Sequence, residues 1–564
     1  MGSDEKRVTR RILGTSDTVK RQNSRECRSF RQRCFLIESE LGRRVGSLSA
    51  PQEAAASSSD AEAMIDGAAR ANALKSEQTP VPSTRDSGDE GRRRDLILHG
   101  ALGKGVLFIA VPSVATMLLQ TTNSMLDRKF VGQLGPEALA AITVSSTLMF
   151  AIMSAAMALS VGTTALVARS VGEGRMDEAV IAVRQSLLLG VALSVLVGVP
   201  MYLLRIPLLS VLGLGAEARA LAARYLAVTV IGLPSLFLML IMNGAFRGMG
   251  DTTRPFWVTV GAIVVHASLN YLLIFGNFGF PRLGLPGGAV ALALSQVTAT
   301  VIYGRFLLRT PLAAVLLPGT LSDGASSRFG AWRPDWEWAW RICRIGLPAS
   351  AQQLIRVGSM LVFQGILART VSGSAAVAAL GVGLVSESVA FMPGFGYAIA
   401  ASAFVGQNLG ARQVTRANEG AWAATYQAVF VMSVMGFLFY QAAAPFAHLF
   451  VQHAVGESAA VARQVDETIR LTIGYLRTVA WSEPFLGLGM VLTGALQGAG
   501  ETVGPTMLTI FTMVVMRVPL ALILLHYTTW GTEGAWIAMS ISTVVQGLLT
   551  VALFRQGKWR TVRV

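Results

Sequence analysis

Long apolar stretches, separated by short polar connectors, fill the chain from about residue 95 to residue 555. A transmembrane α-helix needs about 20 mainly apolar residues to cross the hydrocarbon core of a bilayer. Stretches of this length cover residues 104–130, 138–168, 178–204, 220–246, 255–276, 286–309, 339–369, 374–404, 416–441, 468–497, 504–527 and 533–555. The pattern predicts an all-α membrane protein with twelve transmembrane helices.

The second half of the chain repeats motifs of the first half at an offset of about 240 residues. NGAFRGMGDTTRP (243–255) returns as TGALQGAGETVGP (493–505), and LGLPGGAVALALS (283–295) returns as WGTEGAWIAMSIS (530–542). Because an even number of helices per half keeps both halves in one orientation, this is typical of transporters built from parallel repeats. We expect two pseudo-symmetric six-helix bundles with a substrate site between them. The GMGD and GAGE segments lack the pattern of a phosphate-binding loop and are predicted to be turns.

Polar segments divide the chain into its expected parts. The first 95 residues are rich in Arg, Ser, Ala and Glu without an apolar period, which predicts a disordered basic extension. An organelle transit peptide and a true start at Met64 are two open interpretations of this extension. The expected parts are the extension at 1–95, a first bundle at 96–310, a cytoplasmic linker at 311–338, a second bundle at 339–555 and a tail at 556–564.

Composition and charge narrow the class of protein. Only 14% of the residues are charged and the mean hydropathy is +0.52, whereas soluble domains carry about 25% charged residues. The net charge of +15 does not indicate a nucleic-acid partner, because no basic stripe is interleaved with aromatic residues. The excess of Arg and Lys in alternate connectors favours two cytoplasmic termini. Cys27, Cys34 and Cys343 have neither zinc-site nor disulfide-framework spacing, so no metal or cofactor is expected.

An acid inside the first apolar stretch is the clearest candidate for chemistry. Asp127 follows a polar turn, Gln120 to Ser124, that includes Asn123. Burying a charge at membrane depth costs a few kcal/mol, so such residues are usually functional. The alternative is an interfacial acid paired with the adjacent Arg128 and Lys129. Alignment of the two halves places Phe363 opposite Asp127, which indicates that packing alone does not require the acid.

Two polar residues of the fifth stretch lie one helical turn apart. His266 and Asn270 share a helix face, and the functional interpretation puts both near Asp127, with His266 able to titrate near neutral pH. The alternative is ordinary interhelical hydrogen bonding.

In the second half, Glu387 lies in the middle of an apolar stretch and is expected to be protonated if it has no partner. Arg356 is a possible partner, which would make the two a structural ion pair.

These segments resemble the multidrug and toxic compound extrusion (MATE) family over residues 100–555. The resemblance rests on PSVATMLLQTTNSMLDRKFVGQLG, SVGTTALVARSVGEGR, NGAFRGMGDTTRPF, ESVAFMPGFGYAIAASAFVGQNLGA and TGALQGAGETVGP, in this order. It implies two six-helix bundles that form a V, and export of organic cations and drugs in exchange for protons or sodium.

The resemblance also implies roles for single residues. Asp127 matches the acid of the family's first span, and Pro112 matches the proline that kinks that helix. Asn270 matches the second polar residue of the fifth span, where His266 replaces an asparagine. Leu292 replaces a threonine of the sixth span, and Arg356 stands where the sodium-coupled branch has a glutamate. These departures favour proton coupling through the first half.

The expected function is therefore a multidrug antiporter in the cell (inner) membrane, working by alternating access as a monomer. A proton and an organic cation would compete for Asp127. Alternatives are a related flippase for a lipid-linked precursor, which predicts a strongly cationic cavity and usually fourteen spans, a membrane enzyme, and a receptor or channel. Only five His are scattered along the chain, so no enzymatic cluster is evident.

Overall fold

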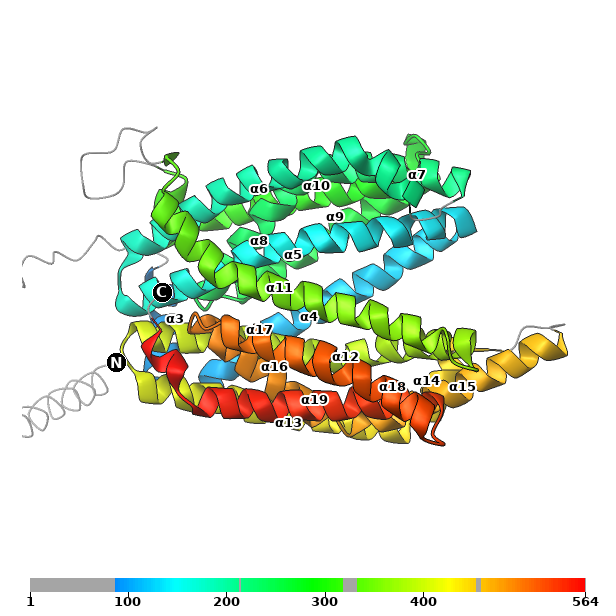
Figure 1. Cartoon of the computed structure of the whole chain (residues 1–564). Coiled ribbons are helices and arrows are strands. Elements are labelled where there is room, and N and C mark those ends of the chain that lie inside the picture. Colours follow the sequence, from blue (N-terminus) through cyan, green and yellow to red (C-terminus); the bar gives the residue numbers. More distant parts are fainter. Residues whose placement is uncertain (1–86, 212–214, 318–331, 453–457, 563–564) are drawn as a thin grey trace, which may run out of the picture. The chain divides into compact units, whose positions relative to one another are not determined.

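The computed structural model describes residues 87–211, 215–317, 332–452 and 458–562, which are helical apart from turns and short connectors. The first half holds α3 (Ser87–Leu98), α4 (Leu102–Gly132), α5 (Pro136–Glu173), α6 (Met176–Val211), α7 (Ala216–Ile231), α8 (Leu233–Gly248), α9 (Thr253–Phe275) and α10 (Leu285–Leu307). The second holds α11 (Trp336–Leu367), α12 (Gly373–Gly410), α13 (Val414–Gln441), α14 (Ala443–Phe450), α15 (Ala459–Ala480), α16 (Glu483–Gly498), α17 (Val503–Ile510), α18 (Arg517–Tyr527) and α19 (Thr532–Arg555). Figure 1 shows their arrangement.

Each of the twelve predicted apolar stretches lies on one of these helices or on a pair of them. In the described ranges, nine continuous segments are long and apolar enough to cross a membrane. Two further spans are bent pairs, α7 with α8 at 52° and α15 with α16 at 57°. The remaining stretch coincides with α11, a 32-residue helix whose apolar character is interrupted by arginines, among them Arg356.

The predicted turns at GMGD and GAGE are confirmed. Gly250 and Gly500 have positive φ angles of 76° and 87°, a conformation that glycine adopts without strain. In the first turn the Asp251 carboxylate accepts hydrogen bonds from the backbone N–H groups of Thr253 and Arg254, at 3.0 and 3.2 Å, which satisfies free donors at the start of α9.

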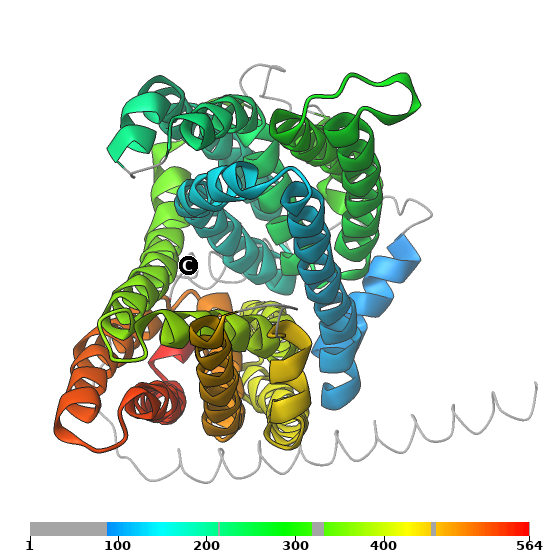
Figure 2. The same ribbon diagram turned by 90° about the vertical axis from the view of Figure 1, so that its right-hand side faces the viewer.

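Helices α4 and α11 each cross from one half of the molecule to the other. The start of α4, with Val106 and Ile109, belongs with Ile97 of α3 to a hydrophobic core built mainly from the second half. The end of α4 packs along α9. The start of α11, with Ile342 and Ile345, belongs to the core of the first half, while Phe363 near its end lies in a core of the second. Figures 1 and 2 show α4 reaching between the two groups of helices. The two bundles are therefore linked by a reciprocal exchange of helix ends.

The halves pack most closely at the end of the helices where α3 lies. Glycines provide the close approach of α5 and α12: a Cβ added to Gly172 would collide with the backbone oxygen of Gln407, and one added to Gly410 would collide with that of Arg169. Seven residues of α4 are buried, and six of them precede Met117. The structure is thus closed at the α3 end.

Helix α3 reinforces this closure and begins inside the segment predicted to be disordered, of which residues 1–86 lie outside the described ranges. We call its contacts the α3 clasp: Arg93 forms an ion pair with Asp251 of the first half, and the carbonyl oxygen of Ile97 accepts hydrogen bonds from Asn408 and Arg416 of the second half. Ile97 itself is fully buried. These contacts order a polar segment whose sequence has no strong helical pattern.

Candidate functional site

A cluster of polar side chains joins α4 to α9 inside the first half. The Asn270 amide donates a hydrogen bond of 2.8 Å to Oδ1 of Asp127, and the Asn123 amide lies 3.4 Å from Oδ2 of the same carboxylate. The imidazole of His266 lies between the two asparagines, with Nδ1 at 3.2 Å from Asn123 and Nε2 at 3.3 Å from Asn270. The sequence-based prediction that His266 and Asn270 lie near Asp127 agrees with this geometry.

The contacts of Asp127 distinguish the functional interpretation from that of an interfacial acid paired with its neighbours. The only ion-pair contact of Asp127 in the described residues is with His266, at 3.8 Å, and none joins it to Arg128 or Lys129. The Asp127 side chain is 27% exposed, whereas His266 and Asn270 are buried. The carboxyl group is thus partly exposed on one side and faces a buried polar wall on the other.

The amide of Asn270 leaves an unused acceptor next to the carboxyl group. Its Oδ1 is buried and has no hydrogen-bond donor within the described part of the chain. A deprotonated Asp127 accepts the N–H of Asn270, whereas a protonated Asp127 has an O–H that needs an acceptor. The cluster can therefore accommodate the carboxyl group in either protonation state.

Two other candidates of the first helix lie outside this cluster. Gln120 is exposed, and its backbone oxygen accepts the Ser124 hydroxyl at 3.1 Å. Pro112 lies where α4 passes between the halves, and α4 continues through it as one helix. Because proline removes one backbone hydrogen bond and weakens the helix locally, Pro112 is positioned for bending.

The second half has its own polar network, around the partly buried Glu387. Its carboxylate accepts a hydrogen bond of 2.5 Å from the hydroxyl of Tyr475, and no ion pair with Arg356 is present among the described residues. The alternative of a Glu387–Arg356 ion pair is therefore wrong.

Two charged residues near Glu387 were missed from the sequence. Glu483 is fully buried with no hydrogen-bond donor to its carboxylate oxygens in the described ranges. Arg517 is buried and donates to Ser542 at 2.7 Å and to Thr543 at 3.1 Å. Arg517 directly follows a π-helical turn, Phe511–Met516, a feature frequent at functional sites. A charged residue within an apolar stretch was the signal that could have identified Arg517.

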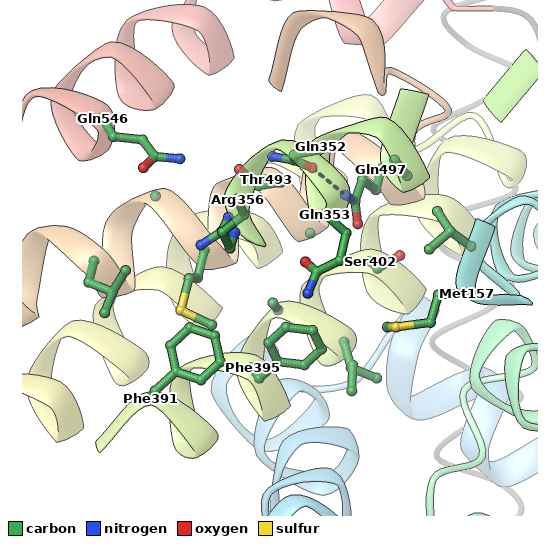
Figure 3. Close-up of a pocket in the computed structure, with 18 of the residues that line it drawn as sticks. Met157, Gln352, Gln353, Arg356, Phe391, Phe395, Ser402, Thr493, Gln497 and Gln546 are labelled. Carbon is green, nitrogen blue, oxygen red and sulfur yellow. Dashed lines mark hydrogen bonds between the residues drawn. The ribbon is translucent and has the colours of Figure 1, made fainter. Parts of the chain in front are cut away.

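A cavity of about 210 Å³ lies between the halves. The second half provides most of its wall, with polar residues on α11, α12, α16 and α19, and the first half adds residues of α5 and of α8, including Arg247. Figure 3 shows Gln353 and Arg356 of α11 on one side and Phe391 and Phe395 of α12 on the other. Neither Asp127 nor its partners line this cavity, so the acid cluster and the cavity are separate sites.

Comparison with known proteins covers both halves. The family model described as MatE matches residues 112–272 and 348–523. The "Probable multidrug resistance protein NorM" of Thermotoga maritima is 27% identical over 464 residues, which are 81% of this chain and 93% of that protein. A "FAD transporter" of Shewanella oneidensis is 25% identical over 452 residues, 80% of this chain and 94% of that protein.

Solved structures with a similar fold are also transporters. The crystal structure of MATE in complex with MaL6 has a TM-score of 0.72 and 27% identity, covering 82% of this chain and 97% of that one. A second structure is that of a MOP superfamily transporter from Pyrococcus furiosus Vc1. It has a TM-score of 0.74 and 25% identity, covering 86% of this chain and all of that one. For that transporter, the reverse polarity of the binding pocket was taken to suggest a different function. Since the family model spans both repeats and more than half of the sequence, the chain belongs to the MatE family of integral membrane transporters, which is not a class of enzymes.

Proposed function

We propose that this transporter exports drug-like organic molecules in exchange for protons by alternating access, with Asp127 as the proton-binding group. The observation that carries the proposal is the contact of the Asp127 carboxylate with Asn270, at 2.8 Å, inside a membrane-spanning bundle. The relatives named as multidrug resistance proteins support a drug-like cargo. We place the protein in the cell (inner) membrane as a monomer, with the α3 end and both termini in the cytoplasm.

The proposed cycle uses the two protonation states of Asp127. With the α3 end closed, a proton from outside binds Asp127. Rotation of the Asn270 amide then lets its Oδ1, which has no donor in the described residues, accept the carboxyl O–H. This changes the hydrogen bonds that join α4 to α9. Because α4 also packs on the second half, a shift of α4 at Pro112 alters the contact between the halves. The titratable groups near the site include His266, the adjacent Arg128 and Lys129, and the buried Tyr225 of α7, which interacts electrostatically with Asp127.

The cation expected from the sequence would compete with the proton for Asp127. The separation of Asp127 from the cavity between the halves favours an indirect coupling, in which proton and cargo bind at different places and bias the same conformational change. Such coupling is a difference in binding free energy between two states of the protein, and it acts in both directions.

The decisive experiment measures transport into proteoliposomes under separately imposed proton and sodium gradients. We expect the pH gradient alone to drive transport, and Asp127→Asn to reduce it to the level of empty liposomes. Asp177→Asn is the matched control, because Asp177 is an exposed acid in the first turn of α6. Full pH-driven transport by Asp127→Asn, or transport driven by sodium alone, would contradict the proposal.

A flippase for a lipid-linked precursor is the second candidate, because Arg247 and Arg356 give the cavity part of the positive charge that it requires. The match to the MatE model and twelve apolar stretches rather than fourteen favour the exporter. Reconstitution with a fluorescent polyprenyl-pyrophosphate sugar distinguishes the two candidates: we expect no protein-dependent movement of this lipid between the leaflets.

A further inference from the structure

The cavity between the halves is lined by two arginines and by no acid. Arg247 comes from α8 of the first half and Arg356 from α11 of the second, and the lining includes no Asp or Glu. Within the described part of the chain, no hydrogen bond or ion pair engages either guanidinium group. Arg356 lies inside α11, and Arg247 lies in the last turn of α8. A positive charge within a span without a counter-charge is costly, and such residues mark substrate or ion pathways.

The nearby acids form no ion pair with these arginines in the described residues. Glu483 is buried without a hydrogen-bond donor and is not part of the cavity wall. Asp251, four residues after Arg247, forms ion pairs with Arg93 and Arg254. Glu387 accepts the Tyr475 hydroxyl and is not part of the cavity wall. The cavity wall therefore provides no counter-charge for Arg247 and Arg356, and their guanidinium groups can bind an anionic ligand.

The rest of the wall is suited to an aromatic molecule with polar substituents. Phe391 and Phe395 are neighbours on α12, with ring centroids 5.8 Å apart. Opposite them, Gln353 points into the cavity beside Arg356 (Figure 3). The amide of Gln497 donates to Gln352 at 3.3 Å, and both residues line the same space. Amides bind neutral polar groups, and guanidinium groups bind carboxylates, sulfonates or phosphates with charge-assisted hydrogen bonds.

We propose that the cavity selects amphipathic organic anions, with the acidic group between Arg247 and Arg356 and an aromatic body against Phe391 and Phe395. This deepens the proposed export function and rests on it, and it reverses the charge of the cargo expected from the sequence. An organic cation in the same place faces two like charges, which penalises binding. Because the two arginines come from different halves, a bound anion also draws the halves together, which links cargo to the conformational state.

The test compares two dyes that share a xanthene ring system: sulforhodamine B, which is an anion, and rhodamine 123, which is a cation. Equilibrium binding to the purified full chain, followed by fluorescence anisotropy, requires no gradient. We expect tighter binding of sulforhodamine B, and a loss of affinity of about tenfold or more in Arg356→Gln and in Arg247→Gln. Arg356→Lys, which keeps the charge, should retain the preference for the anion. Arg344→Gln is the matched control, because Arg344 lies on the same helix, is exposed and does not line the cavity.

The outcomes separate this inference from the proposed function. Tighter binding of rhodamine 123, equal binding of both dyes, absence of binding, or an unchanged preference in both glutamine variants would each overturn the inference. Uptake of the dyes by proteoliposomes under a pH gradient is measured in parallel and tests the export function. Gradient-driven uptake of rhodamine 123 that is unaffected by the arginine substitutions would leave the export function standing and end the inference. The dye preference of the unaltered protein is informative even if a variant fails to fold.

Discussion

Asn270 links Asp127, the proposed proton-binding residue, to a second helix through one short hydrogen bond. Its amide nitrogen donates to Asp127 and its oxygen has no donor in the described residues. A hydrogen bond to a charged group contributes about 1.5–3 kcal/mol to stability. Asn270 therefore has an energetic role in each protonation state of Asp127, although it carries no charge itself.

We expect Asn270→Ala to lower pH-driven transport by about tenfold or more, because 1.4 kcal/mol corresponds to about a factor of ten. Binding of dye to the cavity should be unchanged, since Asn270 does not line it. Asn418→Ala, on α13, serves as the control. If Asn270→Ala and the unaltered protein transport at equal rates, Asn270 is not part of the coupling site.

A second residue-scale prediction concerns Tyr475. Its hydroxyl donates to Glu387, and its ring packs edge-on against Trp536 with centroids 5.1 Å apart. Tyr475→Phe keeps the ring contact and leaves the partly buried carboxyl group without this donor, so we expect a loss of about 1–3 kcal/mol of stability. The effect is measured as a decrease in the Tm of the variant in detergent. Tyr426→Phe is the control, since Tyr426 is 66% exposed, and equal Tm values for the two variants would refute the structural role of the bond.

At the scale of residues, the shared helix face of His266 and Asn270 could be predicted, because helix periodicity is a local property of the sequence. Their proximity to Asp127 depends on the packing of α4 against α9, which the sequence supported only through the functional interpretation. Arg247 was not singled out as a candidate, because it stands four residues before the acid of the predicted GMGD turn. Only the packing of α8 against the second half places it at the cavity. The pairing of Glu387 with Tyr475 depends on contacts across 88 residues of sequence, which periodicity does not encode.

At the scale of elements, glycines set how closely α5 and α12 approach. A Cβ at Gly410 would collide with the backbone oxygen of Arg169, which is not the flexible end of a side chain. This collision can be avoided only if the two helices move apart. The α3 end is therefore closed in part because glycine occupies this position.

We expect Gly410→Ala to increase the population in which the α3 end is open. Spin labels at Asp177 and Thr415, in a background without Cys27, Cys34 and Cys343, report the distance between the halves by pulsed electron resonance. Gly381→Ala on the same helix is the control, because a Cβ there meets nothing within 4 Å. A distance distribution identical to that of the control would show that the contact does not hold this end closed.

The elements themselves were largely predictable, since every predicted apolar stretch lies on a helix. The sequence did not reveal that α7 and α8, or α15 and α16, bend by more than 50° within one span. Nor did it reveal the π-helical turn before Arg517 or the helix α3. These features depend on packing and on charged contacts between distant segments, which override weak local preferences.

At the scale of the whole molecule, the crossing of α4 and α11 determines how the halves can move. Each helix has its start in one half and its end in the other, so relative movement of the halves must bend both. Pro112 and Pro348 lie inside these two helices, where the missing backbone hydrogen bond lowers the cost of bending.

We expect the double variant Pro112→Ala/Pro348→Ala to bind cavity ligands normally and to transport them about tenfold or more slowly, since each restored backbone hydrogen bond opposes bending by about 0.5–1.5 kcal/mol. Pro207→Ala is the control, because Pro207 lies inside α6, which remains within one half. Binding and turnover are measured on the same proteoliposomes. Unchanged turnover in the double variant would show that the halves move without bending at these prolines.

The α3 clasp has a kinetic consequence. One short helix bonds to Asp251 on one side and to Asn408 and Arg416 on the other. These bonds must therefore break together before the halves can separate at the α3 end. The clasp residues do not line the cavity. Where release of the clasp is the slowest step, chemically different cargoes should share one maximal velocity of transport, fixed by the waiting time for that release.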